Sequence, residues 1–338
     1  MEPQTFRTTI TIKPSKEKFE IADSLFSIGS CFAEELNSLM RSGLLQAYSS
    51  PYGTVYNPQS IEMQIHRITH CEKACKSEIV SRDGAYVSMM AHGSVIYTSP
   101  EELLETIDHH THEANRRLRE ARFVIITLGT SYVYYYEPLE TVVANCQKQN
   151  AKLFKRYRIS VDEATASLQK IISDIKAINQ KAQIILTVSP IRHLSDGMTE
   201  NTLSKATLLL ATANVTNGND VQYFPSYEIV LDDLRDYRFY ASDMAHPSAE
   251  AVRYVYNHFA ETYFSEQVRN FAREAEKISA SLRHRPMSQD KRMYAEYLEK
   301  TVQRVTNFAK QYSISKGYSP IEEVVLQLNN LKSDALAE

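Results

Sequence analysis

Two short stretches of the sequence carry side chains that could perform nucleophilic chemistry. Ser30 and Cys31 place a hydroxyl beside a thiol directly after Gly29, and Asp243 and His246 stand three residues apart much later in the chain. A serine or cysteine becomes an effective nucleophile when an imidazole takes its proton, and a carboxylate can fix the tautomer of that imidazole. These residue types could form a nucleophile–imidazole–carboxylate site if the fold brings the two stretches together.

The sequence around Ser30 and Cys31 predicts a buried strand that turns into a helix. Residues 25–29 form a short apolar run ending at a glycine, and apolar residues then recur at helical spacing. A helix N-terminus offers unpaired N–H groups and the positive end of a dipole, so a thiol there beside an imidazole is expected to have a lowered pKa. Glu34 and Glu35, in the same first turn, oppose that shift. The alternative is that Ser30 only caps the helix and Cys31 only fills space.

Further turns and capping motifs predict how the chain positions these residues. Residues 51–58 form a loop with a proline at each end, and the apolar runs 123–128 and 184–188 predict buried strands that end in polar turns. Capping boxes begin helices at Ser99 and Ser160, and each helix leads into one of these strands. Alternating helices and strands predict βαβ units in a parallel, doubly wound α/β sheet.

The two ends of the chain have different compositions. Alternating residues 8–12 predict one edge strand, whereas residues 266–338 are charged and strongly helical. We therefore expect a main domain over residues 1–265 and a C-terminal helical extension over residues 266–338. The extension has enough apolar residues to pack on the main domain or to form a homo-oligomer.

Charge and cysteine content exclude several classes of function. The formal net charge is −3, without a long block of one sign, which argues against nucleic-acid and membrane-surface partners. Four cysteines are too few for a disulfide framework in 338 residues. The N-terminal residues have no apolar leader, and no stretch approaches the length of a membrane span. The expected location is cytoplasmic, with reduced thiols.

Potential metal ligands occur in two places without completing a site. His66, His70, Cys71 and Cys75 cluster on one predicted helix, where the histidine pair and the cysteine pair would point about 100° apart. The histidines within residues 109–112 are expected on the solvated flank of the next helix. Nucleotide-binding glycine motifs are absent as well, so we expect neither a metal nor another cofactor.

Five motifs stand in an order that resembles the GSCFA family, within the SGNH or GDSL-like hydrolase superfamily. They are Gly29-Ser30-Cys31-Phe32-Ala33, residues 51–58, residues 128–130, residues 189–193, and residues 236–240 running into Asp243 and His246. The resemblance spans roughly residues 20–265. It implies a flavodoxin-like three-layer α/β/α domain with a site that cleaves esters or transfers acyl groups.

The resemblance also implies roles for individual residues. Cys31 stands at the place of the superfamily's serine nucleophile, and Ser30 stands where an aspartate is usual; Cys31 is the favoured nucleophile, with Ser30 or no covalent nucleophile as alternatives. Gly53 matches a glycine whose N–H serves the oxyanion hole. Ser131 replaces the asparagine that would supply a further oxyanion donor. Asp243 and His246 match the last motif unchanged.

Three functions remain open at this point. The first is hydrolysis of carbohydrate or lipid O-acyl esters, and the second is O-acyl transfer from a thioester donor. The third is a non-catalytic sugar-binding or scaffold module on the same fold. Asn57, Arg192 and His193 are the candidate substrate-binding residues, and the expected ligand is a small-molecule or glycan ester.

Overall fold

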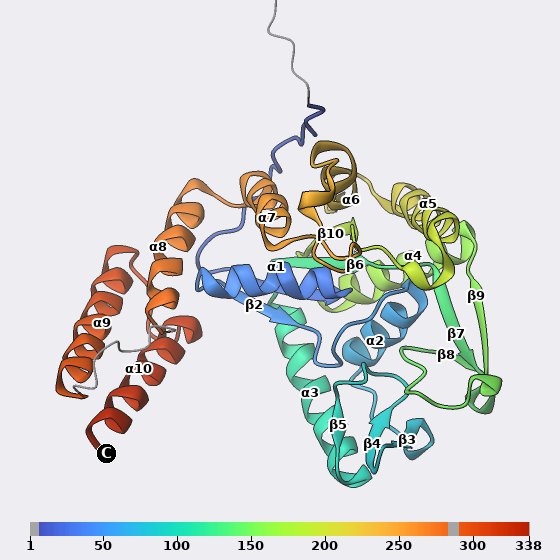
Figure 1. Ribbon diagram of the computed structural model, residues 1–338, viewed down its shortest axis with the longest axis horizontal. Coiled ribbons are helices and arrows are strands. Elements are labelled where there is room, and N and C mark those ends of the chain that lie inside the picture. Colours follow the sequence, from blue (N-terminus) through green and yellow to red (C-terminus); the bar gives the residue numbers. More distant parts are fainter. Residues whose placement is uncertain (1–6, 283–290, 338) are drawn as a thin grey trace, which may run out of the picture.

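A five-stranded parallel sheet forms the centre of the protein (Figure 1). The computed structural model describes residues 7–282 and 291–337. The spatial order is β11-β10-β6-β1-β2, which in chain order of the five strands is the 2-1-3-4-5 order of flavodoxin-like folds. The strands are β1 (Ser24–Gly29), β2 (Gln46–Ser49), β6 (Phe123–Leu128), β10 (Gln183–Val188) and β11 (Val221–Tyr223). The predicted α/β/α fold class is confirmed.

Helices cover both faces of this sheet. One face packs on α1 (Cys31–Ser42) and α7 (Ala249–Tyr263). The other packs on α2 (Pro58–His70), α3 (Pro100–Glu120), α4 (Val161–Ile178) and α5 (Met198–Val215). Successive side chains of a strand point to opposite faces of the sheet, so each strand contributes to two cores. Leu25 of β1 lies in the first core and Phe26 in the second. No helix of residues 7–282 and 291–337 is long and apolar enough to cross a membrane.

Two small antiparallel sheets extend beyond the central layers. β3 (Ile79–Arg82), β4 (Ala85–Ser88) and β5 (Ile96–Tyr97) form one. Asp83 and Gly84 form the turn between β3 and β4, with φ of +52° and +80°. β7 (Tyr132–Tyr136), β8 (Thr141–Val143) and β9 (Phe154–Arg158) form the other, at the right of Figure 1. The sequence patterns did not predict this second sheet.

The expected edge strand at residues 8–12 is wrong. These residues carry no strand. The amide of Ser15 donates to the carbonyl of Thr262, and that of Phe19 to the carbonyl of Tyr263. The N-terminal segment therefore finds its backbone partners at the end of α7 and not in the sheet.

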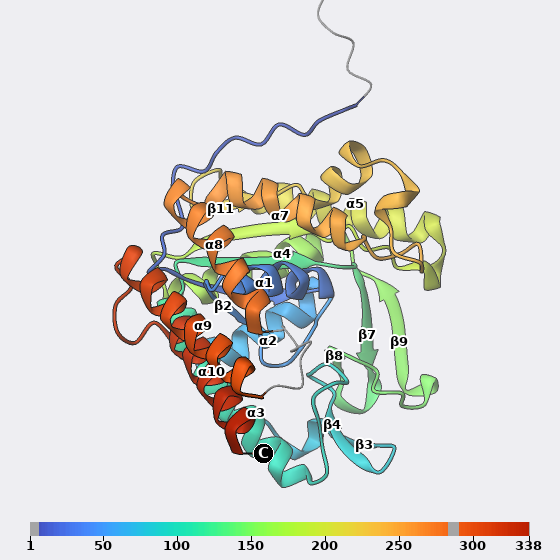
Figure 2. The ribbon, with the colours of Figure 1, turned by 60° about the vertical axis from the view of Figure 1, so that its left-hand side comes forward.

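The predicted C-terminal helices are confirmed, and the first of them packs against α1. They are α8 (Glu266–Leu282), α9 (Lys291–Gln311) and α10 (Ser319–Ala337). Figures 1 and 2 show α8 beside α1, and α9 and α10 pack on each other and on α8. The Ser279 hydroxyl donates to the carbonyl of Ser42 over 2.7 Å, and the Tyr318 hydroxyl to that of Leu44 over 2.8 Å. Apolar side chains of these helices share one core cluster with α1. The domain boundary at residue 265 stays a prediction, because this core crosses it.

Truncation after Ser265 is expected to lower the melting temperature and the solubility of the protein. Leu36 and Met40 of α1 belong to the core cluster that the C-terminal helices complete, so removing the helices exposes apolar surface. Differential scanning calorimetry and light scattering provide the measurement. Truncation after Leu282, which keeps α8 on α1, is the matched control and should cost less. Equal melting temperatures for the full chain and for the chain truncated after Ser265 would contradict the expectation.

Candidate active site

The turn after β1 requires glycine because it lies against a neighbouring strand. Gly29 has φ of +138°, and a Cβ added there would lie 2.1 Å from the carbonyl oxygen of Thr127 in β6. The amide of Ser30 donates to that same carbonyl over 3.0 Å. The chain therefore leaves the sheet in one defined direction, and α1 begins at Cys31.

The two adjacent nucleophile candidates have different surroundings. Ser30 is 2% exposed, and its hydroxyl has no hydrogen-bond partner and does not cap α1. Cys31 is partly buried, and its Sγ lies 3.8 Å from Nε2 of His246. The fold thus brings Cys31 to the imidazole across 215 residues of sequence.

His246 and Asp243 form a tight local pair in the turn before α7. Nδ1 of His246 lies 2.6 Å from Oδ2 of Asp243, and Oδ1 of Asp243 accepts from the amides of Ala245 and His246. These hydrogen bonds, led by the His246 amide, lower the pKa of Asp243 to about 2. The carboxylate is therefore charged at neutral pH and accepts the Nδ1 proton, which leaves the Nε2 lone pair directed toward Cys31.

The expectation of a lowered thiol pKa is wrong. Burial raises the pKa of Cys31, and the charge of Glu35 adds to the rise. The amide N–H groups of Cys31 and Phe32 and the charge of Lys205 act in the opposite direction without overcoming the burial. Cys31 is consequently a thiol at neutral pH, and its attack on a substrate would require a base.

Alkylation of Cys31 by iodoacetamide is expected to accelerate from about pH 7 to about pH 9, because only the thiolate reacts and burial raises its pKa. Peptide mass spectrometry would follow the rate at each pH. Cys75 is exposed and serves as the internal reference; at neutral pH it should react faster than Cys31. Fast, pH-independent labelling of Cys31 would indicate a preformed thiolate and contradict this expectation.

The loop at residues 51–58 is tied to the nucleophile turn through its backbone. The amide of Val55 donates to the carbonyl of Gly29 over 2.9 Å, and the carbonyl of Tyr56 accepts from the amides of Gly129 and Thr130. Gly53 has φ of +76°, and a Cβ there would lie 2.7 Å from Cβ of His92. Three strand-end segments are thus held together at one edge of the sheet, as predicted.

A hollow of about 240 Å³ lies on the Ser30 side of this turn. Gly29, Ser30, Gly53 and Thr54 line it, together with residues from β2 and from the segment around His92. The hollow offers space beside Gly53 and Ser30.

Two sequence-selected residues are engaged in local structure. Ser131 is fully buried, and its amide donates to Oγ of Ser204 over 2.8 Å instead of to a substrate. Its hydroxyl lies 3.1 Å from the same atom. Asn57 caps α2, with Oδ1 accepting from the amide of Ser60 over 2.8 Å. Both side chains hold the scaffold around the site in this structure.

Arg192 and His193 lie close to the His246 turn. The amide of Arg192 donates to the carbonyl of Ala245 over 3.0 Å. Burial lowers the pKa of His193 to about 4, so its imidazole is neutral at pH 7, and its Nε2 is buried without a partner. Arg192 also lines a second hollow of about 260 Å³ with Tyr237, Tyr240 and Met244. These two residues therefore lie beside the turn that carries His246.

The sequence patterns missed a buried lysine at the site. Lys205 of α5 is 1% exposed, and its Nζ donates to the carbonyls of Gly129 over 2.5 Å and Ser189 over 2.7 Å. It thereby joins the ends of β6 and β10. Burial lowers its pKa to about 7. The sequence does contain a signal for this burial, because Lys205 stands three residues before Leu208 and so lies on the same, apolar face of the helix.

Lys205→Met is expected to lower the free energy of unfolding, because two buried carbonyls lose their donor at a cost of about 1–3 kcal/mol each. The folded pKa near 7 lies below the ordinary value of 10.5, so the unfolded chain binds the proton more strongly between these values. Wild-type stability should therefore gain from this group as pH rises through that range, and the variant should lack the gain. Urea unfolding at several pH values tests this, with the exposed Lys181→Met as control. Identical pH slopes for wild type and Lys205→Met would refute it.

Comparison with known proteins places the chain in a family. A sequence model described as the GSCFA family matches residues 24–259. The chain belongs to the GSCFA family. The match runs from β1 into α7 and includes Cys31, Asp243 and His246, while α8 to α10 of this GSCFA protein lie outside it.

Other comparisons give a distant likeness. Among solved structures the protein is similar to an acetyl xylan esterase, Est2A, from the rumen bacterium Butyrivibrio proteoclasticus, at 12% identity and a TM-score of 0.38. The similarity covers 72% of this chain and 64% of that one, so the chain spans less than two thirds of the neighbour's length. The search of curated proteins found no match.

Proposed function

We propose that this GSCFA protein hydrolyses carboxylic esters through a covalent thioester on Cys31. The observation that carries the proposal is the chain of contacts from Sγ of Cys31 to Nε2 of His246 over 3.8 Å, and from Nδ1 to Asp243 over 2.6 Å. Nucleophile, base and orienting carboxylate stand in the order that nucleophilic acyl transfer requires.

The reaction proceeds in two half-reactions. Nε2 of His246 takes the thiol proton while Sγ of Cys31 bonds to the ester carbonyl carbon. The tetrahedral intermediate collapses, and the alcohol leaves with the proton held by His246. A water then gives a proton to the same imidazole and attacks the thioester, which releases the acid and restores the thiol.

The oxyanion of the tetrahedral intermediate would be bound by backbone donors. The amide of Cys31 lies at the N-terminus of α1, where helical N–H groups have no partner within the helix. Gly53 contributes its amide from the loop tied to Gly29. Such donors typically contribute about 3 kcal/mol each to catalysis. Ser131 is left out of this role because its amide and hydroxyl both contact Ser204.

The substrate class we favour is an O-acyl ester of a carbohydrate or a lipid. The hollow beside Arg192 contains the exposed Tyr237 and the half-buried Tyr240, and aromatic faces with a guanidinium suit a polar, hydroxylated alcohol group. The smaller space beside Gly53 suits a short acyl group.

A second candidate is O-acyl transfer from a thioester donor. The observation in its favour is the cysteine itself, because acyl transfer from a thioester donor to the Cys31 thiol breaks one thioester bond and forms another. Here a sugar hydroxyl would replace water in the second half-reaction. The third candidate is a non-catalytic binding module. It is motivated by Ser131, whose amide donates to Ser204 and so is not free to bind an oxyanion.

The test uses p-nitrophenyl acetate and intact-protein mass spectrometry. Hydrolysis with a transient acetyl adduct on the peptide that contains Cys31 supports the proposed hydrolase. Acetyl-CoA consumption that depends on an added glycan would identify the transferase instead. Absence of both turnover and adduct would leave the binding module as the function and overturn the proposal.

A further inference from the structure

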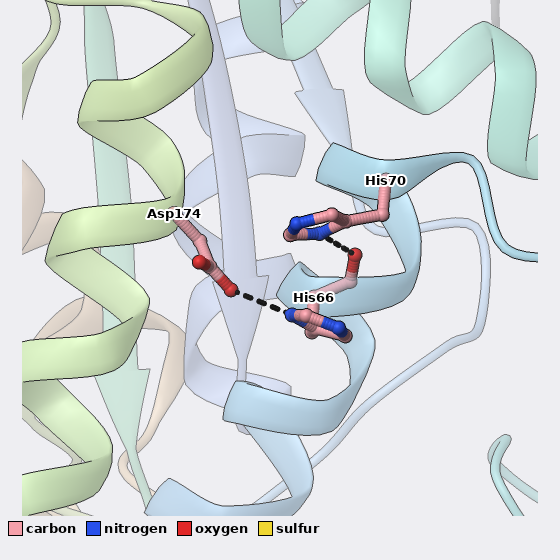
Figure 3. Close-up of side chains that lie close together, drawn as sticks. All are labelled: His66, His70 and Asp174. Carbon is pink, nitrogen blue, oxygen red and sulfur yellow. Dashed lines mark hydrogen bonds and ion pairs between the residues drawn. The ribbon is translucent and has the colours of Figure 1, made fainter.

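A second cluster of chemically competent side chains lies at the C-terminal end of α2, away from Cys31. His66 and His70 stand one turn apart on α2, and Asp174 reaches toward them from α4 (Figure 3). One ligand-type atom of each residue lies within 4.8 Å of the others. We infer that these three residues bind a divalent transition-metal ion, with Zn²⁺ as the best fit.

The tautomer of His70 suits metal binding. Its Nδ1 lies 3.0 Å from the carbonyl oxygen of His66, which can only accept a hydrogen bond, so Nδ1 carries the proton. The lone pair is then on Nε2, and Figure 3 shows that edge of the ring directed toward Asp174. Metal-binding histidines characteristically donate their other ring N–H to a backbone carbonyl or a carboxylate in this way.

His66 stands between two carboxylates. Its Nε2 lies 3.3 Å from Glu72, and its Nδ1 lies 3.0 Å from Oδ2 of Asp174. When Nε2–H donates to Glu72, the Nδ1 lone pair faces a carboxylate oxygen, and a cation between the two resolves that contact. Ligands about 2.0–2.1 Å from a tetrahedral Zn²⁺ stand roughly 3.3 Å apart, close to the 3.0 Å between Nδ1 of His66 and Oδ2 of Asp174. The ligand atoms of all three residues lie within 4.8 Å of one another, so the side chains would close further around a bound ion.

The competing explanation is that the ring of His66 contacts Asp174 and Glu72 directly, without a metal ion. The ring of His66 also lies against that of His70, with the centroids 4.0 Å apart, so the two imidazoles are held next to Asp174 in either case. A metal ion would bind both rings as neutral ligands. The two explanations differ in whether added metal binds.

The ligand set indicates the class of ion. Two imidazoles and one carboxylate suit Zn²⁺, Co²⁺ or Ni²⁺, whereas Mg²⁺ and Ca²⁺ prefer oxygen ligands alone. A fourth position would be open to water, since a groove of about 740 Å³ reaches His66 and Asp174 from the β7–β9 sheet. An ion there would link α2 to α4 and stabilise the folded chain.

The proposed site differs from the expectation of no metal, which rested on sequence spacing. α2 ends at His70, Cys71 follows as a left-handed C-cap with φ of +51°, and Cys75 lies beyond the helix. The cysteines therefore leave the helix face that carries the histidines. The third ligand, Asp174, comes from 108 residues away and could not be found by spacing.

Isothermal titration of the chelator-treated full-length protein with ZnCl₂ tests the inference. One equivalent should bind, and the melting temperature should rise with added zinc. His70→Gln and Asp174→Asn should each raise the dissociation constant by more than about tenfold, and Glu72→Ala by about tenfold because it removes the acceptor for Nε2–H of His66. The double variant His109→Gln/His112→Gln, on the exposed flank of α3, is the matched control and should bind as wild type does.

Cobalt replacement separates this cluster from the Cys31 site. Co²⁺ bound by nitrogen and oxygen ligands gives visible bands without the near-ultraviolet charge-transfer band of a thiolate ligand, and Cys31→Ala should leave the spectrum and the zinc affinity unchanged. A charge-transfer band that disappears in Cys31→Ala would assign the metal to the other site. No zinc binding, or wild-type binding by both His70→Gln and Asp174→Asn, would overturn the inference.

Discussion

Cys31→Ala is expected to reduce turnover of p-nitrophenyl acetate by about 10⁴-fold or more, as removal of the nucleophile does in comparable catalytic units. Sγ of Cys31 is the atom that lies 3.8 Å from Nε2 of His246, so alanine removes the group that the imidazole activates. Cys31→Ser should keep some turnover, because its hydroxyl would occupy the same place. Steady-state kinetics with active-site titration provide the measurement.

Ser30→Ala is the critical companion to that variant. The Ser30 hydroxyl is buried without a partner and lines the hollow beside Gly53, so it is the alternative nucleophile of this turn. We expect Ser30→Ala to retain most of the activity, and Cys75→Ala, at an exposed thiol, to retain all of it. Full activity in Cys31→Ala together with an inactive Ser30→Ala would make Ser30 the nucleophile.

His246→Ala is expected to lower kcat by about 10²–10⁴-fold, the range typical for a general base. Burial raises the pKa of Cys31, so the thiol depends on Nε2 of His246 to take its proton. Asp243→Asn should cost less than His246→Ala, because it disturbs the tautomer of the imidazole without removing the base. Kinetics and thermal unfolding should be measured on the same preparations.

The side chains of His246 and Asp243 are each about half exposed, so neither substitution should change the melting temperature much. His112→Ala, at an exposed histidine of α3, controls for histidine loss as such. A large fall in both activity and melting temperature for His246→Ala would indicate a structural histidine. Unchanged activity in Asp243→Asn would remove Asp243 from the mechanism.

The sequence predicted most of the central fold because each element carried its own local signal. Ser160 and Glu163 were expected to form a capping box, and both of its hydrogen bonds are present at the start of α4. The apolar runs at residues 123–128 and 184–188 are the buried strands β6 and β10. Such signals depend on neighbours within a few residues, so they survive without knowledge of the tertiary structure.

Features that depend on burial were missed or misjudged. The helix N-terminus suggested a lowered pKa for Cys31, but desolvation by the surrounding core has the larger effect and raises it. A lysine is expected at the surface from sequence alone, and only the tertiary structure shows that Lys205 is buried with two carbonyl partners. The β7–β9 sheet pairs Tyr132 with Arg158, and no short-range pattern specifies that register. Each case requires contacts between residues that are distant in the chain.

The packing of the C-terminal helices on α1 has a consequence for synthesis of the chain. Met40 and Phe271 belong to the same core, and the hydrogen bond from Tyr318 to Leu44 joins residues 274 positions apart. At ribosomal rates of about 5–20 residues per second, the C-terminal helices are synthesised roughly 10–50 s after α1. During that interval its apolar face is open to nascent-chain chaperones, and the helix that carries Cys31 is among the last parts of the protein to become fully packed.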